Sequence, residues 1–311
     1  MNPNRDRLKT LIAQIPKTHL LFFGKILGNL LYFLAIPQRR IVRRNLQFSH
    51  IESSPQEIHN LAKRVFRHFG ISILELLQMT CFSQKELLSN MQIEGKEIIV
   101  EALARQKGVV LITAHLGNYE MAWQSVPFYF GRQMTGVAKK MRNVRLDRLI
   151  HRMRKRFGNK IIYKKGALPE MMRTLRQGEM VGILMDISRR FDGVEVNFFG
   201  RRATATPAAA LLGLRCKSPI IPAFCHRRDN GKLIISVERP IEIQRTKGLR
   251  SDLQANTQLI TDRVERAIRN HPEQWNWMLK RWKEFYPDLY PESEKRLKQI
   301  KKKAKKKMKS S

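Results

Sequence analysis

Short apolar runs alternate with helical patterns through the middle of the chain. The runs that we predict as strands are Val109–Thr113, Met134–Ala138, Lys160–Tyr163, Val181–Met185, Ile220–Phe224 and Leu233–Val237. The segments that we predict as helices between them are residues 96–106, 116–125, 143–157, 168–177 and 205–215. This alternation favours an α/β fold with a mostly parallel central sheet that is flanked by helices.

Two longer apolar segments precede this region. Residues 55–79 follow a capping signal at Ser54 and carry apolar residues at helical spacing, which predicts a core helix in which the acid Glu75 is unexplained. Residues 20–36 are apolar apart from Lys25 and Asn29. A spanning helix needs about 20 mostly apolar residues, and a central charge costs about 2.5–3.5 kcal/mol. We therefore predict a membrane-anchoring helix that either spans the bilayer or lies in its interface, with a buried core helix as the alternative.

Composition divides the chain into three parts. Residues 1–50 hold the hydrophobic anchor and its basic flank, residues 51–290 form the main domain, and residues 291–311 are a polybasic tail that is predicted to be disordered. Near the end of the main domain, Trp275, Trp277 and Trp282 lie among basic residues. This pattern predicts either a packing helix or a belt at a membrane interface.

The overall charge points to an anionic partner. The chain has 60 Lys and Arg against 26 Asp and Glu, a formal net charge of +34. Such an excess is typical of proteins that meet nucleic acid, an anionic membrane surface, or an acidic protein or substrate. Nucleic-acid binding is the remote alternative, because the sequence lacks helix-turn-helix, RNA-recognition and zinc patterns. The three cysteines lack a CxxC motif and predict no disulfide framework, no zinc site and a reducing compartment.

The strongest candidate for catalysis is His115, which directly follows the strand at 109–113. Open α/β sheets bind their ligands at the carboxyl ends of strands. Glu120, in the first turn of the next helix, can accept the Nδ1 proton of His115 and leave Nε2 free to take a proton from a hydroxyl. The alternative is a turn histidine with a satisfied hydrogen bond. The absence of a nearby second histidine or cysteine pair predicts no metal.

Two other groups of residues have candidate roles. The predicted helix at 143–157 carries Arg152, Arg154 and Arg156, which are either donors to an oxyanion or phosphate or a solvated face. Asp186 follows the strand Val181–Met185 and is therefore expected at the carboxyl end of that strand.

These features occur together and in a fixed order from about residue 15 to residue 285. The shared motifs are His115 with Glu120, Asn143-x-x-Leu146-Asp147, the arginine helix, Met185-Asp186, Phe198-Phe199-Gly200, Ala203-Thr204 and Trp275-x-Trp277-x-x-x-Arg281-Trp282. In this arrangement the chain resembles the bacterial lipid A biosynthesis acyltransferases, the late lauroyl and myristoyl transferases of the lysophospholipid acyltransferase-like superfamily.

The resemblance implies a membrane-associated O-acyltransferase at the cytoplasmic face of the inner membrane. Its donor would be a fatty acyl thioester on acyl carrier protein, its acceptor a phosphorylated glycolipid of the Kdo-lipid IVA type, and it would need no cofactor. Other acceptors, namely a lysophospholipid, an ornithine lipid or a glycosylated phosphoinositide, are the alternatives. The absence of a Gly-x-Ser-x-Gly elbow predicts direct transfer without an acyl-enzyme.

The resemblance also implies roles for single residues. His115 would be the general base, Glu120 its partner, and Arg154 the group that stabilises the oxyanion, with Arg152 as the substitute if the register differs. Contacts with substrate would come from Asn118, Arg152, Asp186, Phe198, Phe199, Gly200 and Thr204. The family often has Gln after the acid that matches Asp186, whereas this chain has Ile187, and this difference concerns the acceptor contacts more than the chemistry.

Overall fold

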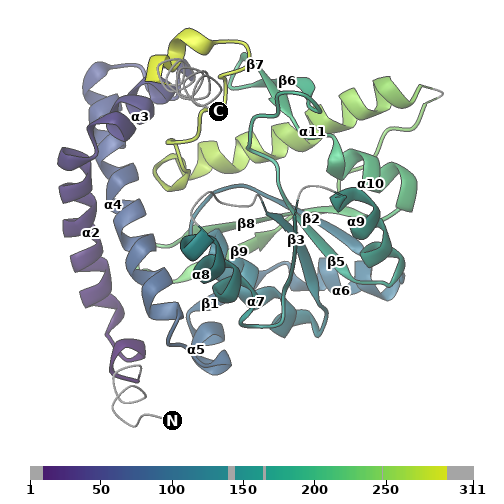
Figure 1. Ribbon diagram of the computed structural model, residues 1–311, viewed down its shortest axis with the longest axis horizontal. Helices are drawn as coiled ribbons and strands as arrows, with labels where there is room; N and C mark the ends of the chain where they lie inside the picture. The colour runs from purple at the N-terminus through teal and green to yellow at the C-terminus, as the bar shows by residue number, and fades with distance from the viewer. Residues whose placement is uncertain (1–9, 139–143, 164–165, 247, 293–311) are drawn as a thin grey trace, which may run out of the picture.

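The structure is a computed structural model that describes residues 10–138, 144–163, 166–246 and 248–292 (Figure 1). Within these residues a seven-stranded sheet has the order β1-β9-β8-β2-β5-β3-β4. Its strands are β1 (Met91–Glu94), β2 (Val109–Thr113), β3 (Met134–Ala138), β4 (Lys160–Tyr163), β5 (Met180–Leu184), β8 (Ile220–Arg227) and β9 (Leu233–Val237). Neighbouring strands pair in parallel except β8 and β9, which are antiparallel. The predicted α/β fold with a mostly parallel sheet is confirmed.

Helices cover both faces of the sheet. The helices α9 (Ala167–Arg176), α10 (Ala208–Cys216) and α11 (Leu249–Asn270) lie on one face, and α6 (Lys96–Ala104) and α7 (Tyr119–Phe130) lie on the other (Figure 1). The remaining helices are α2 (Lys17–Leu34), α3 (Ile36–Phe48), α4 (Pro55–Met79), α5 (Gln84–Ser89) and α8 (Val144–Lys155). The helix predicted at 116–125 begins three residues later, because the Asn118 side chain accepts the Met121 N–H and acts as its N-cap.

A separate two-stranded hairpin packs against α11. Strands β6 (Val194–Phe198) and β7 (Arg201–Ala205) pair in antiparallel fashion. Their connection is the two residues Phe199 and Gly200, both at positive φ (55° and 69°). Two-residue hairpin turns with positive φ match the twist of the strands.

The tryptophan-rich segment is part of the core and is not a helix. Apart from a 3₁₀ turn at Pro272–Gln274 and another at Pro287–Leu289, its backbone is irregular. Trp275, Trp277 and Trp282 are at most 1% exposed and pack against Phe198 and Phe199. The predicted packing role of these rings is confirmed, because they are buried against the hairpin, but the segment is not the predicted helix. Because the rings are buried, the alternative of an interface belt is wrong. Residues 293–311 of the polybasic tail lie outside the described residues.

Helix α2 packs closely along α4, and the two run side by side in Figure 1. Glycines make this approach possible: a Cβ added at Gly28 would lie 2.3 Å from the Phe66 carbonyl oxygen, and one at Gly70 would lie 2.3 Å from the Gly24 carbonyl oxygen. The opposite side of α2 exposes large apolar side chains, namely Phe22, Phe23, Ile26, Leu30, Phe33 and Leu34. The N-terminal segment is thus a surface helix with one side against α4 and an apolar side left open.

Among the described residues, no helix alone is long and apolar enough to cross a membrane; α2 and α3 meet that test only as a pair, by length and composition, and are bent by 94° where they join.

Candidate active site

His115 and Asp186 are brought together by the register of two neighbouring strands. In the parallel pair β2–β5, Thr113 lies opposite Leu184. His115 and Asp186 each stand two residues beyond these positions, so the same register places them opposite each other. His115 Nδ1 lies 2.9 Å from Asp186 Oδ1, and the His115 backbone N–H donates to Asp186 Oδ2 at 2.7 Å. The partner of the imidazole is therefore Asp186.

The Asp186 carboxylate is fully buried and held on several sides. Trp275 Nε1 donates to its Oδ2 at 2.8 Å, in addition to the two contacts from His115. Burial by itself raises the pKa of Asp186, but the charge of His115 and these hydrogen bonds outweigh burial and lower the pKa below its usual value. Because Asp186 is ionised, the proton of a neutral His115 sits on Nδ1. Nε2 is then the basic nitrogen.

The same pair changes the basicity of the imidazole. Burial lowers the pKa of His115, but the Asp186 carboxylate reverses that effect, and the net shift raises the pKa above 6.5. A histidine with a raised pKa is a stronger base once it has lost its proton. The environment of His115 thus suits proton abstraction from an alcohol.

Glu120 has a different partner from the predicted one. Arg154 Nε donates to both of its carboxylate oxygens, at 3.2 and 3.0 Å, and Arg154 Nη2 adds a further close contact with Oε1. The prediction that Glu120 accepts the Nδ1 proton of His115 is wrong, because Asp186 occupies that position and Glu120 faces α8. Glu120 is 7% exposed, and its charge holds the Arg154 guanidinium at the site.

Two cavities meet at this cluster. The first, of about 100 Å³, lies between α7 and the sheet. Its apolar lining includes Leu111, Trp123, Val126, Met134, Gly136, Gly182 and Ile235. The second, of about 110 Å³, lies between α4 and the segment 273–278 and is lined by His115. Tyr119 and Glu120 line both cavities, and Arg154 lines the first, so the polar groups stand where an apolar chain and a second ligand can come together.

This arrangement agrees with a match along nearly the whole chain. A family model described as bacterial lipid A biosynthesis acyltransferase matches residues 8–284. The chain belongs to this family. It is therefore an acyltransferase of the lipid A biosynthesis type, and the family resemblance seen in its motifs is confirmed.

Individual relatives of this acyltransferase have low sequence identity, but the matches cover two thirds or more of this chain. The lipid A biosynthesis lauroyltransferase of Escherichia coli (strain K12) is 24% identical over 277 residues, which are 88% of each chain. The lipid A biosynthesis myristoyltransferase of the same strain is 22% identical over 276 residues, 85% of this chain and 84% of its own. A phosphatidylinositol mannoside acyltransferase of Mycobacterium tuberculosis (strain CDC 1551 / Oshkosh) is 24% identical over 214 residues, 67% and 66% of the two chains.

The three arginines predicted on the helix at 143–157 lie in three environments in this acyltransferase. Arg152 and Arg154 are on α8, and Arg156 follows its last residue, Lys155. Arg154 is the one that reaches the site. Arg152 is exposed, and Arg156 donates to carbonyl groups at the end of α4, including that of Met79 at 3.1 Å. The substitute role of Arg152 is thus not supported by its position. Asn143, the first residue of the Asn143-x-x-Leu146-Asp147 motif, lies outside the described residues.

The other predicted contacts with substrate lie behind or beside the candidate site. Asn118 is buried at the start of α7, and Phe198 and Phe199 are buried among the tryptophans. Gly200 is exposed in the hairpin turn, and Thr204 Oγ1 accepts the Arg189 N–H at 2.9 Å. Contact between these five residues and substrate stays a prediction.

Sequence reasoning missed two residues at the site and gave no metal to place there. These residues are Tyr119, whose ring centroid is 4.8 Å from that of His115, and Trp123, which lines the apolar cavity. In the sequence both look like ordinary residues of a helix. No group of three or more His, Cys, Asp or Glu side chains that could hold a metal is found within the described ranges.

Proposed function

We propose that this acyltransferase moves a fatty acyl chain from an acyl thioester, carried by acyl carrier protein, to a hydroxyl of a lipid A precursor of the Kdo-lipid IVA type. The observation that carries the proposal is the setting of His115: a buried carboxylate holds its Nδ1, and the neighbouring Tyr119 and Glu120 line both the cavity that contains His115 and the apolar cavity. That combination provides a base for an alcohol and room for a hydrocarbon chain.

His115 does the proton transfers in the proposed reaction. Nε2 takes the proton of the acceptor hydroxyl as its oxygen attacks the thioester carbonyl, and the imidazolium that forms is stabilised by Asp186 at 2.9 Å. When the C–S bond of the tetrahedral intermediate breaks, the same proton passes to the leaving sulfur. The products are an ester and a thiol, and His115 returns to its neutral form without an acyl-enzyme.

Arg154 is the proposed partner of the developing oxyanion. Glu120 engages its Nε and Nη2, which fixes the guanidinium plane beside the first cavity. A fixed cation needs little reorganisation as negative charge forms, and loss of one such donor costs about 2.7–4 kcal/mol of transition-state stabilisation. Glu120 therefore acts here by orienting Arg154 rather than His115.

The two cavities suit the two substrates. The first is mostly apolar and takes the acyl chain, while the second, which includes His68, Ser72 and His115, takes the hydroxyl-bearing part of the acceptor. The net charge of +34 complements both an acidic carrier protein and a phosphorylated glycolipid. An acceptor built on mannosylated phosphatidylinositol is a second candidate, supported by the match to a phosphatidylinositol mannoside acyltransferase.

The proposal is tested by an assay with purified protein, a panel of acyl carrier protein thioesters and three acceptors: Kdo-lipid IVA, a mannosylated phosphatidylinositol and a lysophospholipid. We expect acyl transfer to Kdo-lipid IVA with kcat/KM at least about 10²-fold above the other acceptors, because a site built for a given polar head group leaves buried polar groups unpaired with the wrong one. Preference for the mannosylated lipid would select the second candidate. Transfer to none of them would refute the proposed function.

We also propose that the protein works at the cytoplasmic face of the inner membrane, with α2 seated in the lipid interface. The supporting observation is the exposed apolar side of α2, where Phe22 and Phe23 are 60% and 55% exposed. Arg40 and Arg43 are exposed on the adjoining α3. Apolar side chains next to basic ones are typical of helices that lie on anionic lipid.

Replacing Phe22 and Phe23 together by Ser is expected to lower the fraction of protein that sediments with vesicles of phosphatidylcholine and phosphatidylglycerol. Each phenylalanine that enters the apolar layer contributes about 1.5–3 kcal/mol, so we expect the vesicle affinity to fall at least about 10²-fold. Leu249→Ser is the control, because Leu249 is 50% exposed at the start of α11, away from α2 in Figure 1. Equal vesicle binding by the wild type, the double phenylalanine variant and Leu249→Ser would show that α2 is not the membrane-binding segment.

A further inference from the structure

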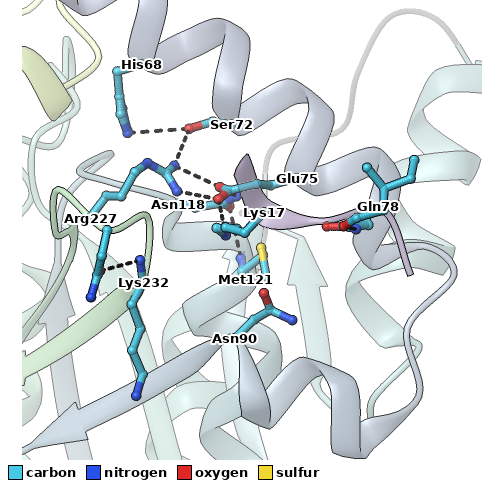
Figure 2. Close-up of polar contacts among 12 residues, drawn as sticks. Lys17, His68, Ser72, Glu75, Gln78, Asn90, Asn118, Met121, Arg227 and Lys232 are labelled. Carbon is cyan, nitrogen blue, oxygen red and sulfur yellow. Dashed lines mark hydrogen bonds and ion pairs between the residues drawn. The ribbon is translucent and has the colours of Figure 1, made fainter. Parts of the chain in front are cut away.

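Glu75 brings a negative charge into the interior of the protein. Its side chain on α4 is 1% exposed and accepts hydrogen bonds from three other elements (Figure 2). Lys17 Nζ donates to Oε1 at 2.7 Å, Asn118 Nδ2 donates to Oε2 at 2.8 Å, and the Arg227 guanidinium contacts both oxygens, with Nη2 2.8 Å from Oε2. Burial raises the pKa of Glu75, but Arg227 and Lys17 bring it down to about 2, so the carboxylate is charged. A buried ion pair usually stabilises a fold no more than apolar side chains of similar volume would. A contribution to stability therefore does not explain why this buried position has a charged residue.

One end of this network fixes Asn118. The Asn118 carboxamide is 2% exposed and is used at both ends: Nδ2 donates to Glu75, and Oδ1 accepts the Met121 N–H at 3.2 Å. Its orientation is therefore determined. Asn118 caps α7 and lies three residues after His115 and two before Glu120. The position of Asn118 therefore determines where the backbone places both of these residues.

The other end fixes the turn through Gln274. The Arg227 N–H donates to Gln274 Oε1 at 2.7 Å, and Gln274 Nε2 donates to the Arg227 carbonyl at 2.9 Å. The Gln274 carbonyl in turn accepts the Gly117 N–H at 3.0 Å. Gly117 has φ of +58°, and a Cβ there would lie 2.4 Å from the Cys225 carbonyl oxygen, so the turn sits directly against β8.

We propose that Glu75 and Arg227 are positioning residues, which hold the turn 115–118 so that His115 and Glu120 face the substrate cavities. The Arg227 side chain holds the turn through Glu75 and Asn118, and the Arg227 backbone holds it through Gln274 and Gly117. Substitution of the side chain therefore removes the first link and leaves the second. Neither charge lies at the reacting atoms; each acts through the residues of the turn. This positioning role rests on the proposed function only where it is tested by the kinetics of acyl transfer.

The test compares a variant that removes both charges with a matched core variant on the same helix. In Glu75→Met with Arg227→Met, apolar side chains fill the site, and buried ion pairs replaced in this way often keep their stability. Leu61→Ala removes a fully buried leucine from α4 without touching the turn and lowers the melting temperature. The double variant is expected to melt close to the wild type yet to lose about 10²-fold in kcat with little change in KM, since small displacements of catalytic groups have effects of this size.

A second readout does not need substrate. NMR of ¹⁵N-histidine-labelled protein reports the tautomer of His115, assigned by comparison with His115→Ala. We expect a single Nδ1–H tautomer in the wild type and in Leu61→Ala, and a mixture of tautomers in the double variant. If the double variant does not fold, Arg227→Lys takes its place with the same expectation, because Lys keeps the charge but cannot span both carboxylate oxygens.

Wild-type kcat and a single tautomer in the double variant would overturn the proposal. So would a loss of kcat in Leu61→Ala as large as that in the double variant, because the effect would then follow stability alone. If the wild type transfers no acyl chain to any acceptor, the proposed function fails, and the tautomer of His115 alone decides the positioning role.

Discussion

Replacing His115 by Ala is expected to lower the kcat of acyl transfer by about 10²–10⁴-fold, the usual contribution of a general base. The acceptor hydroxyl then has to lose its proton to water, while the cavities and Arg154 stay in place. KM should change little, because the imidazole acts mainly on the transition state. The measurement is steady-state transfer from an acyl carrier protein thioester to the acceptor that the panel assay selects, together with thermal unfolding.

His59→Ala is the control for that experiment. His59 is a partly buried histidine on α4 whose Nδ1 lies 3.1 Å from the Tyr32 hydroxyl, outside both cavities at the site. It should keep wild-type kcat. Turnover of His115→Ala within a few-fold of the wild type would show that His115 is not the base.

The second large effect separates the two carboxylates. Asp186→Asn is expected to lower kcat by up to about 10⁴-fold, as happens when the carboxylate that orients a serine-protease histidine becomes an amide. The Asn amide can face Nδ1 with its NH₂ group and favour the wrong tautomer. Glu120→Gln should instead lower kcat by about 10²–10³-fold, the size of a lost oxyanion contribution, because it loosens Arg154.

The pH profile distinguishes these causes. The proposed mechanism requires neutral His115, and since Asp186 raises the pKa of His115 above 6.5 despite burial, the acid limb of kcat/KM should lie above pH 6.5 in the wild type. In Asp186→Asn the pKa falls, so the limb of the residual activity moves to lower pH. In Glu120→Gln the limb should move in the same direction but less far, because Glu120 makes the weaker contribution to the raised pKa. A larger displacement in Glu120→Gln than in Asp186→Asn would restore Glu120 as the partner of His115.

Local sequence patterns predicted the elements around the site well. The strands β2, β3, β4 and β9 and the helix α4 have the predicted bounds, because each is a clear apolar run or a capped helical pattern. What these patterns do not contain is the order of strands in the sheet. His115 and Glu120 are neighbours in sequence, whereas Asp186 is 71 residues from His115 and becomes its partner only because β5 lies beside β2.

Other differences have the same origin in tertiary packing. The four-residue edge strand β1 and the hairpin β6–β7 are too short or too polar to stand out, and the long helix α11 was not predicted. The three tryptophans have a composition that fits a membrane interface as well as a core, and only their neighbours Phe198 and Phe199 decide between the two. Glu75 was visible as an odd acid, but its partners Asn118 and Arg227 are 43 and 152 residues away.

The Trp123 ring and the two glycines beneath it have a consequence for how this enzyme can diversify. A methyl group at Gly136 or Gly182 would come within 2.2 or 2.6 Å of ring carbons of Trp123, so the ring fills the space that the missing side chains leave on β3 and β5. A smaller residue at 123 would return that space to the neighbouring apolar cavity without moving a strand. Under the proposed function, a single codon change would therefore alter which fatty acids enter the lipid product, and with them the fluidity of the membrane that contains it, while the base, its carboxylate and the sheet are inherited intact.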